Sequence, residues 1–177
     1  PRIKVRLFAG WSFDTNLCQK PDMIEIAYQS GVPMGADLEH DKFIEKPKLL
    51  ALATQDPMGQ KLEALQVIKG WVDVEGRMHN EVITVAEADE GQGSFCKIWV
   101  DEGFEADLPT YYYLRAVEPQ TPRWHTYDCD RIKAAERPAV CSDGSYPKMT
   151  IEMAWSSPIW YQPEAAELTL AKNPNLK

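Results

Sequence analysis

The chain has 177 residues, of which 44% are hydrophobic and 26% are charged, with 10 glycines and 13 prolines. This composition fits one globular domain and excludes a disordered, collagen-like or coiled-coil chain. Nineteen basic against 27 acidic residues give a formal net charge of −8, which repels phosphate backbones and anionic lipid. We therefore expect neither nucleic acid nor a membrane as a partner, and no apolar run reaches the roughly 18 residues of a membrane helix.

The first residues, 1–4, read Pro-Arg-Ile-Lys and contain neither an initiator Met nor an apolar targeting stretch. We expect the chain to begin inside a longer protein or to have been trimmed. A signal peptide would precede the segment at hand, so the location stays open, with a periplasmic or secreted one among the options.

Histidine is scarce. The three residues, His40, His79 and His125, lie far apart and form no H-x-H or H-E-x-x-H motif. A metal hydrolase that depends on clustered imidazoles would need ligands from elsewhere.

Four cysteines include no C-x-x-C motif, which argues against a zinc knuckle or a redox pair. Cys129 and Cys141 flank a turn-rich stretch. They either pair in an oxidising compartment or remain free as small apolar side chains, as Cys18 and Cys96 also can.

Hydrophobic alternation is the main structural signal. Residues 2–7 alternate strictly between basic and apolar side chains, as in a half-buried strand. The run 62–74 leads through Glu75-Gly76 into 81–85, which predicts an antiparallel hairpin. The predicted strands are 2–9, 49–54, 62–74, 81–85, 96–100, 110–117 and 151–155.

Two short segments have helical signals. The first, 21–29, begins with Pro and has Gly31 just beyond its end; the second, 130–137, stops at Pro138. The sequence thus predicts a mainly β fold, an antiparallel β-sandwich-like domain with one or two short helices and long loops. We assign residues 1–163 to this β-rich domain and 164–177 to a C-terminal tail.

One acidic segment could bind a metal ion. Asp37, Glu39, His40 and Asp41 lie within five residues, and such oxygen and nitrogen donors suit a divalent cation. The alternative is an exposed acidic loop, because a metal site needs convergent ligands on rigid elements.

Aromatic and charged residues gather in 121–128 and 155–161. In the first segment they could bind an anion, a sugar or an aromatic ligand; alternatively, Arg123 pairs with Asp128 while Trp124 and Tyr127 cover one end of the sandwich. The second segment is more typical of an interface. The substrate or interface candidates are Arg123, Trp124, His125, Tyr127, Glu152, Trp155, Trp160 and Tyr161.

Five sequence blocks, in order, resemble a large uncharacterised bacterial family of PHP-type metal-dependent hydrolases. They are PRIKVRLFAGW at 1–11, GVPMGADL at 31–38, LQVIKGWVD at 65–73, YYYLRAVEPQTPRWHTYD at 111–128 and AWSSPIWY at 154–161. The resemblance implies that the metal ligands lie in an upstream β/α barrel and that this chain is the β-rich C-terminal portion.

The resemblance also implies divalent metal ions in the upstream barrel and no cofactor in this segment. One departure is Met153, where the family commonly has an arginine. The first functional hypothesis is a non-catalytic domain that packs against or completes the active-site mouth of the barrel and can form a homo-oligomer. The second is a free-standing binding module whose Trp124, Trp155 and Trp160 form a ligand platform; a third is an independent enzyme that uses Asp37, Glu39 and His40.

Overall fold

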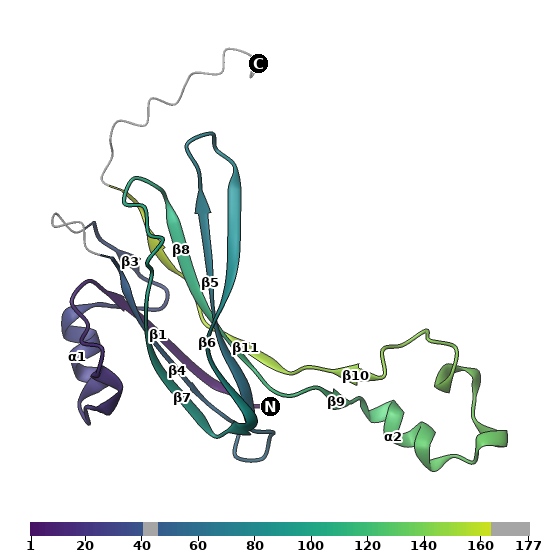
Figure 1. Cartoon of the computed structure of the whole chain (residues 1–177). Helices are drawn as coiled ribbons and strands as arrows, with labels where there is room; N and C mark the ends of the chain where they lie inside the picture. Colours follow the sequence, from purple (N-terminus) through teal and green to yellow (C-terminus); the bar gives the residue numbers. More distant parts are fainter. Residues whose placement is uncertain (41–45, 164–177) are drawn as a thin grey trace.

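The computed structural model describes residues 1–40 and 46–163, and only the backbone of Asp89. Two sheets, a short helix on one of them and a projecting arm make up the described part of the chain (Figure 1). The strands are β1 (Lys4–Gly10), β2 (Val32–Pro33), β3 (Asp37–Leu38), β4 (Lys48–Thr54), β5 (Leu62–Val72), β6 (Met78–Gln92), β7 (Ser94–Val100), β8 (Thr110–Val117), β9 (Thr121–Pro122), β10 (Met149–Thr150), β11 (Met153–Trp155) and β12 (Ile159–Tyr161). The helices are η1 (Leu17–Gln19), α1 (Met23–Ser30), α2 (Trp124–Arg131), η2 (Ala134–Glu136) and η3 (Ala139–Cys141).

The body of the molecule is a sandwich of two sheets. Sheet A has the strand order β2-β1-β4-β7, and sheet B has the order β3-β12-β8-β5-β6 with β11 also paired to β8. Every pairing is antiparallel except that of β3 with β12. The predicted mainly β, sandwich-like fold with short helices and long loops is therefore confirmed.

The main core lies between the two sheets. Sheet A contributes Leu7 and Leu49, and sheet B contributes Leu65, Val67 and Leu114, all fully buried. Alternation along each strand explains this arrangement, because every second side chain points to the same face. The predicted hairpin is confirmed, since β5 pairs antiparallel with β6 along most of its length.

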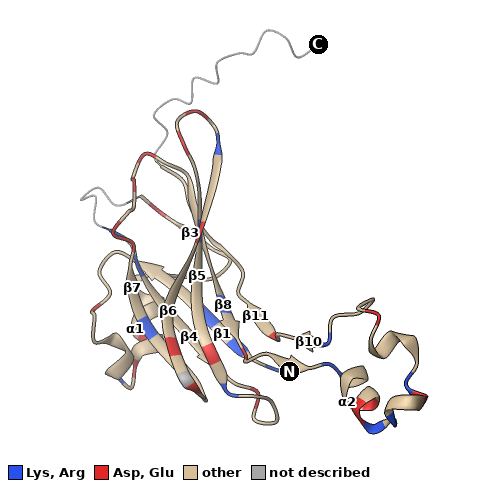
Figure 2. Cartoon of the chain, turned by 45° about the vertical axis from the view of Figure 1, so that its right-hand side comes forward, with Lys and Arg blue, Asp and Glu red and all other residues tan. Residues whose placement is uncertain are grey.

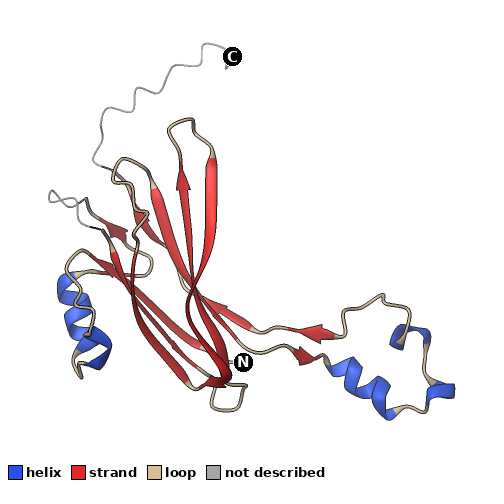
Figure 3. Ribbon diagram, in the orientation of Figure 1, coloured by secondary structure: helices blue, strands red, loops and turns tan. Residues whose placement is uncertain are grey.

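Helix α1 and the turn η1 cover the other face of sheet A (Figure 3). Phe8 and Leu50 of the sheet pack there against Phe13, Leu17 and Ala27. A disulfide between Cys18 and Cys96 joins η1 to β7 across a sequence separation of 78 residues. The predicted helix at 21–29 is confirmed as α1, whereas the sequence has no local signal for this cysteine pair.

Residues 118–152 form an arm that leaves the body (Figures 1 and 3). The two short strands β9 and β10 pair antiparallel as its stalk, and α2, η2 and η3 form its tip. Cys129 and Cys141 form a disulfide that closes the tip. Of the two alternatives for these cysteines, the structure shows the pair.

The helix predicted at 130–137 is wrong. Helix α2 begins at Trp124, directly after extended Arg123, and ends at Arg131. Contacts with distant residues determine the bounds of this helix. The Thr126 hydroxyl donates to the Lys148 carbonyl at 2.7 Å, and the Cys129–Cys141 disulfide folds the following chain back. The predicted tail at 164–177 lies outside the described residues. In the described part of the chain, no helix is long and apolar enough to cross a membrane.

The two disulfides should differ in their effect on the sandwich. Replacing Cys18 and Cys96 together by Ser is expected to lower the free energy of unfolding by roughly 3–5 kcal/mol, because this bond closes a long loop and joins two layers of the body. Replacing Cys129 and Cys141 is expected to leave the unfolding of the sandwich within about 0.5 kcal/mol, because the arm lies outside the core. Urea unfolding followed by far-ultraviolet circular dichroism measures both, and equal losses would contradict this assignment.

Candidate functional site

The arm carries five of the candidate residues, Arg123, Trp124, His125, Tyr127 and Glu152, and three of them are exposed to solvent. Trp124 is 77% exposed and Tyr127 is 52% exposed. The Arg123 Nε donates to the Met149 carbonyl at 3.3 Å, and Asp128 lies 3.8 Å from Arg131. The expected Arg123–Asp128 pair is therefore wrong, and so is the packing of Trp124 and Tyr127 on the end of the sandwich, because the stalk holds them away from the body.

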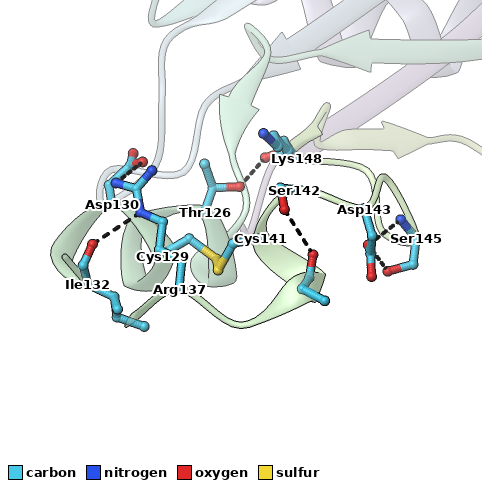
Figure 4. Close-up of a disulfide and its surroundings, with 11 residues drawn as sticks. Thr126, Cys129, Asp130, Ile132, Arg137, Cys141, Ser142, Asp143, Ser145 and Lys148 are labelled. Atoms are coloured by element: carbon cyan, nitrogen blue, oxygen red, sulfur yellow. Dashed lines mark hydrogen bonds and ion pairs between the residues drawn. A yellow bond between two sulfur atoms is a disulfide. The ribbon is translucent and has the colours of Figure 1, made fainter. Parts of the chain in front are cut away.

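The Cys129–Cys141 disulfide organises the tip of the arm (Figure 4). Beside it, the Arg137 Nε donates to the Ile132 carbonyl at 3.1 Å, and Thr126 anchors α2 to the stalk. A cavity of about 570 Å³ opens next to the disulfide, and its walls include Trp124, His125, Ile132, Pro138, Val140 and Tyr146. Among the described residues, His125 Nε2 is buried without a hydrogen-bond partner.

The arm leaves the body at Glu118, whose side chain is 3% exposed. Its Oε1 has no hydrogen-bond partner among the described residues, and burial raises the pKa of this carboxyl. Its backbone N–H donates to the carbonyl of the candidate Glu152 at 2.9 Å. Glu152 thus contributes its backbone to the root of the arm.

The second group of candidates lies on sheet B, on the face away from sheet A. Register places Trp160 opposite Tyr111, Gly70 opposite Tyr111, and Ile68 opposite Tyr113. Directly opposite residues share one face of a sheet. We define the outer aromatic face as Tyr111, Tyr113, Trp155 and Trp160 with Ile68 and Val82.

Ring contacts order the outer aromatic face. Tyr111 and Tyr113 stack at 6.3 Å between ring centroids, and Trp160 lies 5.2 Å from Tyr111. Gly70 makes room for the Tyr111 ring, since a Cβ there would lie 2.2 Å from it. Trp155 and Trp160 remain 57% and 43% exposed, so this face has apolar surface that the described chain does not cover.

Tyr161 differs from its neighbours because its side chain is fully buried. Its hydroxyl donates to the Ala106 carbonyl at 2.6 Å and lies 2.7 Å from His40 Nδ1. Tyr161 therefore belongs to the interior and not to an exposed interface.

The weak metal candidates Asp37, Glu39 and His40 do not point to a common site in the structure. Asp37 pairs in β3 beside Trp160, Glu39 accepts the Trp11 indole N–H through its backbone carbonyl, and His40 contacts Tyr161. In residues 1–40 and 46–163, no three His, Cys, Asp or Glu side chains are placed to hold a metal ion. Asp41 lies outside the described residues.

Sequence reasoning missed a buried polar cluster between the sheets. Lys69 of β5 forms an ion pair with Asp101 at 2.6 Å, with both side chains at least nine-tenths buried. The Tyr112 hydroxyl donates to the same carboxylate at 2.6 Å. Burial and the Asp101 charge hold the pKa of Tyr112 well above its usual value. A signal was present, because Lys69 occupies an inward position between Val67 and Trp71.

The cluster borders a cavity of about 420 Å³, lined by residues of both sheets. Its walls include two indole rings, Trp71 and Trp99, and the carboxylates of Glu81, Glu102 and Glu105. Trp71 is held from two sides: its ring stacks on His79 at 5.3 Å, and Lys69 Nζ lies 5.4 Å from its centroid. His79 is partly exposed, and its Nε2 lies 2.8 Å from the Asp73 carboxylate.

The fold and these surfaces define a mainly antiparallel β-sandwich domain with a projecting, disulfide-closed arm. The chain belongs to the family described as Protein of unknown function (DUF3604), which matches residues 1–92 and 87–163. No curated protein matches the chain, and no solved structure does.

The effects of substituting Lys69 and Asp101 on the free energy of unfolding should be strongly coupled. Lys69→Met leaves Asp101 as an uncompensated buried charge and is expected to lower the free energy of unfolding by roughly 3–5 kcal/mol. The double variant Lys69→Met/Asp101→Asn removes both charges and keeps an acceptor for the Tyr112 hydroxyl, so it should recover at least half of that loss. Urea unfolding measures the cycle, and additive losses would contradict the coupling.

Proposed function

We propose that this chain is the non-catalytic β-domain of a PHP-type metal-dependent hydrolase. In this proposal, an upstream catalytic barrel holds the divalent metal ions, and the chain packs against that barrel or completes its active-site mouth. The ordered sequence blocks that resemble the PHP-type family support this function. Family membership alone leaves the activity open.

The arm is the observation that carries the proposal. Helix α2 has no buried residue, and Trp124, Tyr127 and Tyr146 are 77%, 52% and 61% exposed. A segment that extends from the body and leaves large aromatic side chains in water is typical of a surface that docks on a partner. The arm carries charges of both signs (Figure 2), as the rim of an interface commonly does.

The outer aromatic face also supports docking against a neighbouring domain. The arm continues from β8 and returns into β11, the strands that carry Tyr113 and Trp155. In Figure 1 the arm leaves the body on the side of sheet B opposite to sheet A. A neighbouring domain seated between the stalk and sheet B would therefore cover both apolar surfaces at once.

The alternative is a free-standing binding module with an aromatic platform. The structure does not form the expected platform of three tryptophans, because Trp124 lies on the arm whereas Trp155 and Trp160 lie on sheet B. The docking function accounts for both locations.

The first test compares the isolated chain with a polypeptide that includes the segment encoded upstream. We expect the isolated 177 residues to bind no stoichiometric transition metal and to hydrolyse no p-nitrophenyl phosphate, whereas the longer polypeptide does both. Plasma mass spectrometry and an absorbance assay measure these outcomes. Stoichiometric metal with turnover in the isolated chain would overturn the proposal, as would an upstream segment without H-x-H motifs.

The second test follows the arm in the same two polypeptides. Amide hydrogen exchange in 123–131 and 153–160 is expected to slow at least tenfold when the upstream segment is present, because docking removes these backbones from solvent. Trp124→Ala/Tyr127→Ala should abolish that protection and leave the melting temperature of the isolated chain unchanged. Met58→Ala, at a residue 94% exposed on a loop of the body, is the matched control and should retain the protection. Equal exchange in both polypeptides would contradict docking through the arm.

A further inference from the structure

The cavity between the sheets contains chemistry that the docking function does not use. Its residues belong to β5, β6, β7, the loop before β8 and the first residue of β8, and none of them lies on the arm or on the outer aromatic face. With a volume of about 420 Å³ it falls within the range of roughly 300–1,000 Å³ that is usual for small-molecule sites.

Lys69 places a buried hydrogen-bond donor in the wall of this cavity. Its ammonium group donates to Asp101 and to the Gly103 carbonyl at 2.9 Å. An ammonium group has three N–H bonds, and the described residues provide acceptors for two of them. A side chain this deeply buried gains from a further acceptor, because an unpaired donor is costly away from water.

The other residues that line the cavity restrict the kind of ligand that can supply this acceptor. Glu81 and Glu105 repel an anionic ligand, whereas the Glu102 carboxylate is paired with Lys46. The Lys69 ammonium disfavours a cation in contact with it, and an entirely apolar ligand would leave the polar groups of the wall without water. A neutral ligand with many hydroxyl groups satisfies both the donor and the carboxylate acceptors.

Trp99 adds a flat apolar surface to the same cavity, whereas the Trp71 ring beside it already contacts His79 and Lys69. Sugars combine hydroxyl groups at their edges with apolar faces of C–H bonds, which pack on aromatic rings. We propose that this cavity binds a neutral pyranose sugar, with Lys69 donating to one hydroxyl oxygen, Glu81 and Glu105 accepting from others, and the Trp99 indole packing on the sugar ring.

The test uses Trp indole N–H signals in ¹⁵N-labelled protein, assigned with Trp71→Phe and Trp99→Phe. The methyl α- and β-pyranosides of glucose, galactose, mannose and xylose, and N-acetylglucosamine, are each titrated to 50 mM. At least one of them is expected to shift the Trp71 and Trp99 signals saturably and to leave those of Trp155 and Trp160 unchanged. Trp99→Ala and Glu81→Gln should each weaken this binding at least tenfold, because they remove a packing surface and a carboxylate acceptor.

Trp155→Ala, on the outer aromatic face, is the matched control and should bind as the unaltered chain does. Thermal unfolding of each variant confirms that it is folded before titration. No saturable shift with any of these sugars would overturn the proposal, as would equal binding by Trp99→Ala or shifts confined to Trp155 and Trp160. These outcomes are independent of the arm, so the sugar site and the docking function can fail separately.

Discussion

The alternation of side chains along β8 is the constraint on which the rest of the structure depends. This strand pairs with β5, β11 and β12, so its register fixes which residues of three other strands face inward. Its inward residues, Tyr112 and Leu114 among them, are fully buried, whereas Tyr111 and Tyr113 lie on the outer aromatic face. A shift of one residue would exchange core and surface throughout sheet B.

The Lys69–Asp101–Tyr112 cluster reinforces that register from inside. A buried ion pair contributes little net stability, because the desolvation of both charges offsets their attraction. It is sensitive to geometry, however, since Asp101 must meet Lys69 from β5 and Tyr112 from β8 at the same time. The cluster thus selects one pairing of β5 with β8, and it leaves polar groups at the edge of a cavity.

Local patterns predicted the strands because alternation and turn residues are local properties of the sequence. The run 110–117 and the hairpin around Gly76 are found as expected. Contacts between distant residues were not predictable in the same way: nothing near Cys18 indicates Cys96, and nothing near Lys69 indicates Asp101. The sequence pattern predicts the wrong bounds for helix α2, because its hydrogen bond to Lys148 and its disulfide to Cys141 determine its ends more strongly than the helix propensities of its residues do.

The same limit applies to the candidate site residues: their types were evident from the sequence, but their grouping in space was not. Composition identified 121–128 and 155–161 as chemically rich, but only the fold separates them into an arm, an outer sheet face and a buried Tyr161. The inward lysine in an otherwise apolar alternation was readable in the sequence and marks the cavity. Disulfides persist mainly in oxidising compartments, so the two pairs favour the periplasmic or secreted location that the sequence left open.

The construction of the arm bears on how it could bind a partner. Helix α2 has eight residues, fewer than the roughly 12–15 at which an isolated helix becomes even marginally stable in water. It also has no buried residue, so its order must come from the disulfide, from the β9–β10 stalk and from the Thr126 hydrogen bond. These covalent and polar ties restrict the arm before any partner arrives. Because less conformational entropy is then lost on association, a small aromatic surface on a preorganised arm can bind more tightly than the same side chains on a flexible loop.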